Sequence, residues 1–190
     1  DGEFTRKVYF DGNGKTIKFT ETVYDGGNYF SAFRFEADAT VKNLTVDMEE
    51  AKSGFNGRFR AISSKGNLTV DNCTFIGNGS TNNTRAIIFG EGAGANATNL
   101  AISVTNSTFK GWKRGISDNE NAQDVKTVTI TGNTLTDAGV GVSAKETVTF
   151  TGNTVAGAYV NIKSYTAGNK LAVTATGNTL EANTETAYNV

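Results

Sequence analysis

Residues 126–135 read KTVTITGNTL, residues 146–155 read ETVTFTGNTV and residues 171–180 read LAVTATGNTL. The tetrapeptide TGNT thus begins at Thr131, Thr151 and Thr176, each time after a run in which apolar residues alternate with polar ones. Alternation with a period of two predicts a half-buried β-strand, and a Gly-Asn pair predicts a tight corner. One strand and one corner that recur in this way predict a backbone that repeats itself.

The same pattern recurs upstream of these three copies. It is visible in NLTVDMEE (43–50), NLTVDNCTF (67–75) and LAISVTNSTF (100–109). The last apolar residues of the six aligned runs are Val46, Val70, Val104, Ile130, Phe150 and Ala175. Their mean spacing is about 26 residues, a length typical of repeats that stack on their neighbours.

Each copy continues past its corner with two further apolar segments. The first contributes one apolar residue per copy, namely Phe75, Phe109, Leu135, Val155 and Leu180. The second reads as a third short strand: RAISS (60–64), RAIIFG (85–90), RGISD (114–118), VGVSA (140–144) and VNIKS (160–164). Three short strands and three corners per repeat predict one coil of a parallel β-helix.

In such a coil every strand pairs with its equivalents above and below, at a distance of roughly 4.8 Å. Like side chains therefore stack on like, with Val and Ile in the interior and corner asparagines in ladders of amide hydrogen bonds. We predict an all-β domain of about seven coils over residues 1–190, with opening coils in 1–40 and repeated coils in 41–190. The polar ending EANTETAYNV (181–190) indicates a module of a longer protein.

Other repeat folds fit less well. Helical solenoids need apolar residues at positions i, i+3, i+4 and i+7, and no long window of the sequence has that spacing. Propeller blades need roughly 40 residues per unit. A β-sandwich is an open alternative, although it does not predict near-identical corners.

The segments FDGNGKTIKF (10–19) and ATVKNLTVD (39–47), with the recurring VTxTGNTL…GVGVS pattern, resemble the right-handed parallel β-helix, or pectate-lyase-like, repeat proteins of bacterial surface or secreted type. The resemblance covers nearly the whole chain and implies a right-handed, single-stranded β-solenoid. It does not select an activity, because this architecture hosts lyases, glycoside hydrolases, phage tailspikes and surface adhesins. Lyases of the family use Asp-bound calcium with an Arg or Lys base, and the hydrolases use clustered Asp residues.

Composition excludes several classes of function. The formal net charge of −1 does not favour nucleic acid as a partner, and no apolar run is long enough to insert into a membrane as a helix. The chain has no histidine and one cysteine, Cys73, which excludes Ser–His hydrolases, internal disulfides and zinc sites built on His or several Cys. The segment DGNGKT (11–16) lacks the ligands of a calcium loop and predicts a tight turn. We expect no metal and no cofactor.

Two aspartates are the candidate catalytic pair. In the alignment above, Asp47 and Asp71 occupy matching outward positions on adjacent coils, so their carboxyl groups could lie roughly 5 Å apart. Acid–base work on a glycosidic bond requires such a pair. The row continues as Thr105, Thr131, Thr151 and Thr176 with no third acid, and solvated strand residues are the alternative interpretation.

The outward threonines suggest a third function. Thr45, Thr69, Ser103, Thr129, Thr149 and Thr174 form one row beside the row just described. A flat Thr-x-Thr array on a solenoid could order surface water, as in ice-binding proteins. Thr is also a favoured residue of strands, and this is the simpler explanation.

A basic edge is the main candidate for ligand binding. Arg60, Arg85 and Arg114 begin equivalent third strands, with Trp112 and Lys113 close by in sequence. Stacked guanidinium groups repel one another unless acids or an anionic ligand intervene, and they match carboxylate, sulfate or phosphate groups in geometry. Trp112 would supply a stacking surface for a sugar. Alternatively, each Arg pairs with a local acid, such as Glu91, Asp118 or Glu120, or binds a corner carbonyl.

The sequence therefore predicts a non-catalytic, adhesin-like module that binds a polysaccharide or a host or cell-surface glycan, anionic glycans included. We expect it to be secreted or attached to the cell surface, and monomeric. A polysaccharide lyase or glycoside hydrolase of the pectate-lyase-like fold is the alternative.

Overall fold

The computed structural model describes residues 2–20, 22–23, 30–53, 59–79, 83–90, 99–119, 125–165, 170–181 and 188–189. This part of the chain contains β-strands and no helices. Eighteen strands belong to one sheet, and β3 (Thr22–Val23) pairs with β6 (Lys52–Ser53) in a second. The strand pairs run parallel throughout the large sheet. The protein is therefore all-β, as the sequence predicts.

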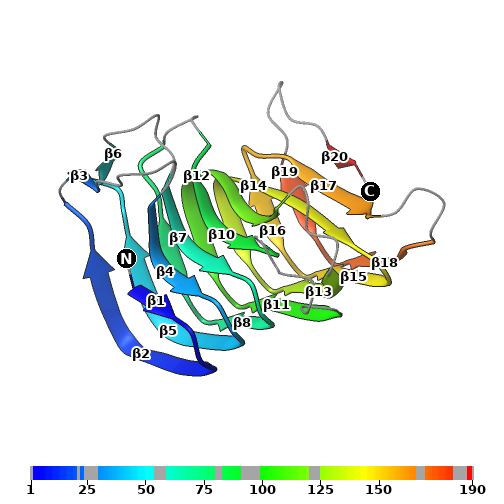
Figure 1. Ribbon diagram of the computed structural model, residues 1–190. Helices are drawn as coiled ribbons and strands as arrows, with labels where there is room; N and C mark the ends of the chain where they lie inside the picture. Colours follow the sequence, from blue (N-terminus) through cyan, green and yellow to red (C-terminus); the bar gives the residue numbers. More distant parts are fainter. Residues whose placement is uncertain are drawn as a thin grey trace.

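The large sheet is divided into three stacks of paired strands (Figure 1). The first stack comprises the leading halves of β2 (Val8–Lys18) and β5 (Ala39–Asp47), then β8 (Leu68–Asp71), β11 (Leu100–Thr105), β13 (Val125–Thr131), β15 (Thr147–Thr151) and β18 (Ala172–Thr176). The second comprises the trailing halves of β2 and β5, then β9 (Thr74–Ile76), the leading parts of β12 (Thr108–Asp118) and β14 (Thr134–Ala144), β16 (Thr154–Ala156) and β19 (Thr179–Glu181). The third comprises β1 (Gly2–Phe4), β4 (Phe30–Phe35), β7 (Phe59–Ser64), β10 (Arg85–Phe89), the trailing parts of β12 and β14, β17 (Val160–Ser164) and β20 (Tyr188–Asn189).

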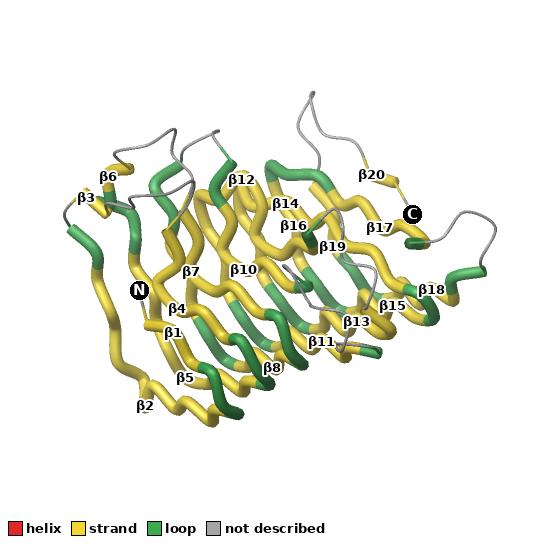
Figure 2. Tube along the Cα trace, viewed as in Figure 1, coloured by secondary structure: helices red, strands yellow, loops and turns green. Residues whose placement is uncertain are grey.

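The chain visits the three stacks in turn and advances along them in sequence order, from blue at one end to red at the other in Figure 1. Where the connecting residues are described, short loops join the strands at several of the corners, as Figure 2 shows. This arrangement is consistent with a β-solenoid.

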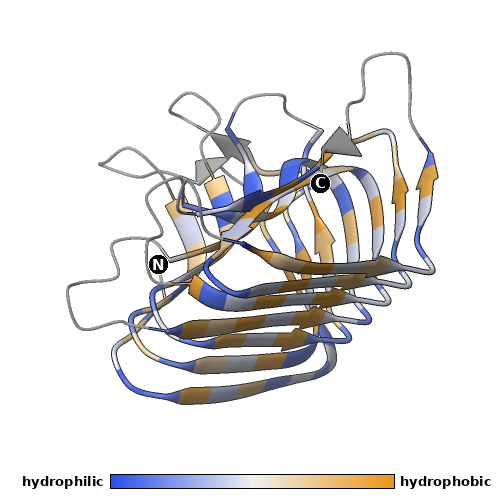
Figure 3. Cartoon of the chain, turned by 90° about the vertical axis from the view of Figure 1, so that its right-hand side faces the viewer, coloured by the Kyte–Doolittle hydropathy of each residue, from blue (hydrophilic) through white to orange (hydrophobic). Residues whose placement is uncertain are grey.

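Columns of apolar side chains fill the interior. In the first stack Val41, Val70, Val104, Ile130 and Phe150 pair in register and are at most 2% exposed. In the second stack Phe75 lies on Phe109, with ring centroids 5.1 Å apart. The alternating colours along the strands in Figure 3 follow this inward and outward alternation. Because each fully buried apolar side chain contributes about 1.5–3 kcal/mol, these columns are the main source of stability.

One position of the predicted alignment is wrong. The register places Val41, not Val46, beneath Val70, and Val46 beneath Phe75 in the second stack. The segment ATVKNLTVD contains two alternating runs, and its corner is the single residue Asn43 with a φ of 52°. Asn tolerates this left-handed conformation better than most residues, so the chain turns there without a glycine.

The corner between the first two stacks holds the predicted amide ladder. The Oδ1 atoms of Asn133, Asn153 and Asn178 accept hydrogen bonds from the backbone N–H groups of Ser107, Asn133 and Asn153, each at 2.9 Å. Ser107 continues the ladder, because its hydroxyl accepts from the backbone N–H of Cys73 at 3.1 Å. These bonds satisfy buried corner amides, whose burial would otherwise cost free energy.

The third stack differs from the other two in the burial of its outward face. Its outward column runs Ser63, Ile88, Ser117, Gly141 and Asn161 in register. The first three side chains are at most 3% exposed, whereas Gly141 and Asn161 are partly exposed. The outward face is thus covered over β7, β10 and β12 and opens over β14 and β17.

Candidate functional site

The three arginines form a column on the third stack, as the sequence predicts. Arg85 pairs in register with Arg60 on one side and with Arg114 on the other. The column ends at Gly139, which is the register partner of Arg114 in β14. Arg60 and Arg85 are only 8% and 7% exposed, while Arg114 is partly exposed. Only the last of the three therefore lies at the open part of this face.

Arg85 has a structural role. Its Nη1 atom donates to the backbone oxygen of Asp118 at 3.0 Å, and its Nε atom donates to Oδ1 of Asn83 at 3.4 Å. The alternative in which an arginine binds a backbone carbonyl therefore applies to Arg85. Glu91 and Glu120, the other two acids of that alternative, lie outside the described residues.

Trp112 does not provide a stacking surface for a sugar. Its side chain is 1% exposed, and its ring packs edge-on against Phe59 at 5.7 Å. The indole Nε1 donates to the backbone oxygen of Phe75 at 3.1 Å. The sequence-based prediction for Trp112 is wrong because β12 turns the indole inward, where it fills the core between the second and third stacks.

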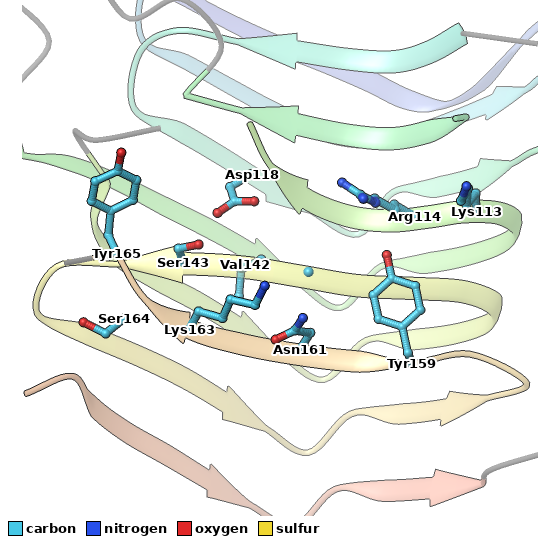
Figure 4. Close-up of a pocket in the computed structure, with 11 residues that line it drawn as sticks. Lys113, Arg114, Asp118, Val142, Ser143, Tyr159, Asn161, Lys163, Ser164 and Tyr165 are labelled. Carbon is cyan, nitrogen blue, oxygen red and sulfur yellow. The ribbon is translucent and has the colours of Figure 1, made fainter. Parts of the chain in front are cut away.

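The open part of the third stack contains a groove with a volume of about 520 Å³ (Figure 4). Strands β12, β14 and β17 line it, together with the residues on either side of β17. The lining residues include cationic, acidic, aromatic and hydrogen-bonding side chains: Lys113, Arg114, Asp118, Ser143, Tyr159, Asn161, Lys163, Ser164 and Tyr165, together with Gly141 and with Val142, whose side chain belongs to the core. This combination is suited to binding a polar ligand through its hydroxyl and charged groups.

Tyr159 lies against a strip of glycine in the floor of the groove. A Cβ atom on Gly139 would meet Cε1 of the tyrosine ring at 2.5 Å, and one on Gly141 would lie 3.7 Å from Cε2. Because both positions lack a side chain, the ring can rest on the backbone of β14. The ring is partly exposed, so it provides the aromatic surface that Trp112 does not. The spacing Gly-x-Gly in DAGVGVS was the available sequence signal for this site.

The groove carries an excess of positive charge. Lys113, Arg114 and Lys163 contribute three cations against the single carboxylate of Asp118 among the described lining residues, a formal +2. Lys113 and Lys163 are exposed, and neither takes part in the ion pairs that the described part of the chain forms. Among the described residues, these two lysines of the groove therefore have no ion-pair partner.

Asp118 is buried at the inner end of this groove. Desolvation raises the pKa of its carboxyl above the ordinary value of 3.8, and hydrogen bonds from Ser143 and the charges of Arg85 and Arg114 act in the opposite direction. Burial has the larger effect on the pKa, because the carboxylate loses more hydration than these partners replace.

The candidate catalytic pair is not a pair. Asp71 lies beside Lys42 in the first stack, with Oδ2 and Nζ 3.8 Å apart, whereas Asp47 lies beside Ile76 in the second stack. The prediction that the two carboxyl groups match on adjacent coils is therefore wrong, for the same reason as the position of Val46. Asp71 also accepts hydrogen bonds from the Thr105 hydroxyl at 2.7 Å and the Asn106 amide at 2.9 Å. These contacts give it a structural role.

The DGNGKT segment forms the predicted turn. Asp11 Oδ1 accepts from the backbone N–H of Asn13 at 2.8 Å and from the Asn43 amide at 3.0 Å. Within the described residues, no group of three or more His, Cys, Asp or Glu side chains is placed to hold a metal ion.

The threonine rows exist, with one change. The first row contains Thr40 in place of Thr45 and continues through Thr69, Ser103, Thr129, Thr149 and Thr174. Thr45 belongs instead to an unbroken column on the second stack: Thr16, Thr45, Thr74, Thr108, Thr134, Thr154 and Thr179. Every member of this column is partly or fully exposed.

The described residues include no helix long and apolar enough to span a membrane. In comparisons with known proteins, no family model, no curated protein and no solved structure matches this chain.

Proposed function

We propose that this chain is a right-handed, single-stranded parallel β-helix of about seven coils, and that it serves as a non-catalytic binding module of a secreted or cell-surface bacterial protein. It belongs to the pectate-lyase-like repeat architecture, works as a monomer in the manner of an adhesin, and takes carbohydrate rather than nucleic acid as its ligand. The in-register stacks support the coil, since the seven threonines of the second stack each come from a different repeat.

The observation that carries this function is the groove over β12, β14 and β17. Sugars present hydroxyl groups around a ring with apolar faces, and proteins bind them with hydrogen-bonding side chains and a partly exposed aromatic ring. Asn161, Ser143 and Tyr159 supply these groups in one place. The rigid strands beneath hold them in fixed positions, which lowers the entropic cost of binding.

The groove favours binding over glycoside hydrolysis. Hydrolases require two carboxyl groups, about 5–9.5 Å apart, and Asp118 is the one carboxylate among the described lining residues. A lyase is the enzymatic alternative. β-Elimination can use a cation together with a Lys or Tyr base, and the groove contains cationic side chains and tyrosines.

The exposed threonine column favours ice binding as a second candidate function. Its seven members repeat at the strand spacing of roughly 4.8 Å on one face. Thermal hysteresis of the purified protein, with Thr134→Lys as the matched variant, tests this function. Equal hysteresis in the wild type and the variant rules it out.

A glycan-array screen followed by calorimetry on the hits tests carbohydrate binding. Each hit is then incubated with the protein, with and without calcium, and assayed for reducing ends and for unsaturated products. The proposal predicts binding without turnover. Turnover would make the chain an enzyme, and the absence of any glycan hit would remove carbohydrate as the ligand.

A further inference from the structure

We propose that the groove is specific for an anionic sugar residue, with the sugar ring on Tyr159 and its carboxylate or sulfate held by Arg114, Lys113 and Lys163. This inference rests on the proposed carbohydrate binding and specifies its ligand class and contacts.

The position of Tyr159 is fixed by the strand beneath it. Gly139 and Gly141 leave room for one face of the ring against β14, and any larger side chain at Gly139 would displace the ring. A ring that is already immobilised loses little rotamer freedom when a ligand stacks on it. Its other face is the natural place for the apolar face of a pyranose.

The cations lie beside this ring. Arg114 is the register partner of Gly139, the residue that the ring covers, so its backbone is one strand spacing away, roughly 4.8 Å. Lys113 precedes it, and Lys163 comes from β17 on the other side of β14. In Figure 4 the side chains of Arg114, Tyr159 and Lys163 lie around the same stretch of β14.

The charges of Arg114, Lys113 and Lys163 are available to a ligand to different degrees. The described acid of the groove, Asp118, is bonded to Ser143 and interacts with Arg85 and Arg114. Lys113 and Lys163 have no such acid among the described residues. An anion placed between them and Arg114 would form charge-assisted hydrogen bonds, which are about twice as strong as neutral ones.

The local extent of the charge favours a sugar over a nucleic acid. Nucleic-acid binding needs cations along a surface that follows the phosphate backbone. Here a formal +2 is confined to one groove of about 520 Å³ in a chain whose net charge is −1. The groove also contains Asn161 and Ser143, which can bind sugar hydroxyls, next to the cations.

The test is calorimetric titration of the whole chain with three probes. These are an oligogalacturonate, a heparin-derived oligosaccharide, and a fully methyl-esterified oligogalacturonate as the neutral analogue. Binding of either acidic probe at least roughly 10-fold tighter than the neutral one is expected, and tight binding of the oligogalacturonate shows that a carboxylate without sulfate is sufficient. Lys163→Gln and Arg114→Gln should each weaken acidic-probe binding by roughly 10-fold.

Two further variants separate the ring from the charge. Tyr159→Ala should weaken binding of the acidic and the neutral probe alike, whereas Tyr159→Phe should retain binding of both. Lys110→Gln, on an exposed lysine of the second stack, is the matched charge control and should have no effect.

Equal affinity for acidic and neutral probes would overturn the inference and leave the proposed carbohydrate binding intact. The inference also fails if Lys110→Gln weakens binding as much as Lys163→Gln does, since the attraction would then be non-specific. If no glycan binds at all, the proposed function itself fails.

Discussion

The side-chain oxygen of Asn153 accepts two hydrogen bonds from Asn133, one from its backbone N–H at 2.9 Å and one from its amide Nδ2 at 3.1 Å. The amide of Asn153 in turn donates to the backbone oxygen of Ile130 at 3.0 Å. Each asparagine of the ladder thus connects one repeat to the next at a buried corner. The ladder continues the repeat-to-repeat register across the corner, between the strand pairs that end at Thr131–Thr151 and resume at Thr134–Thr154.

Asn153→Ala should destabilise the protein by about 2–4 kcal/mol, because it removes the acceptor of the buried Asn133 backbone N–H and the donor to the Ile130 backbone oxygen. Asn153→Ser should cost less, since Ser107 occupies the equivalent position and accepts a backbone hydrogen bond there. Urea denaturation measures both changes. Thr154→Ala, on the exposed neighbour, is the control and should stay within about 0.5 kcal/mol of wild type. Equal losses for Ala and Ser would contradict the role given to the ladder.

Gly139→Ala should weaken stability through its collision with the Tyr159 ring, whose Cε1 atom would be 2.5 Å from the new Cβ. In the Tyr159→Ala background the same substitution should cost much less, because no ring is present to be displaced. A double-mutant cycle measured by thermal unfolding gives the coupling, which we expect to be about 0.5–3 kcal/mol. Additive effects of the two substitutions would show that Gly139 is not required by the ring.

Trp112 is the single tryptophan of the chain, so its fluorescence reports on one environment. Since the indole is buried and hydrogen-bonded to Phe75, its emission should be blue-shifted and resistant to quenching by iodide. Saturation with a glycan should leave the quenching unchanged. Exposure of the indole to iodide in the folded protein would restore Trp112 as a candidate sugar contact.

The sequence predicts the stacking better than it predicts the surface. Val70, Val104 and Ile130 align correctly because their runs end in recognisable corners with similar residues. Val46 does not, because the corner at Asn43 has no glycine and the two halves of β5 have the same alternation. Because the alignment misses the corner at Asn43, it pairs Asp47 with Asp71, although the two residues lie in different stacks.

The groove shows a second limit of prediction from the sequence. The repeat predicts Arg114, with Lys113 beside it, but Tyr159 and Lys163 come from β17 and its preceding turn, where no basic or aromatic repeat exists. The register between β14 and β17 pairs VGVSA (140–144) with VNIKS (160–164), as the repeat predicts, but the repeat pattern does not relate Tyr159 and Lys163 to the arginine column. The inward turn of Trp112 depends on the irregular register of β12 against β14.

Asp71 should protect the fold at neutral pH but not in acid. Hydrogen bonds from Thr105 and Asn106, with a smaller effect of Lys42, lower the pKa of its carboxyl below 3.8 in the folded state. A lowered folded-state pKa gives stability that is present above about pH 4 and lost as the pH falls through the folded-state value. Asp71→Asn should therefore destabilise the protein at pH 7 and have a smaller effect near pH 2. Unfolding temperatures measured across this range test it, and a constant difference would contradict the carboxylate's role.

Asp118 should show the opposite dependence. Burial raises the pKa of this carboxyl above 3.8, so the folded state holds its proton more tightly than the unfolded state does. Wild-type stability from this group is then fully present below about pH 4 and decreases as the pH rises through the folded-state value. Asp118→Asn, which cannot ionise, should gain stability relative to wild type as the pH rises from 3 to 7. Chemical denaturation of both proteins at several pH values measures the change. A relative stability that falls with rising pH would mean that the charges of Arg85 and Arg114, rather than desolvation, dominate at this carboxyl.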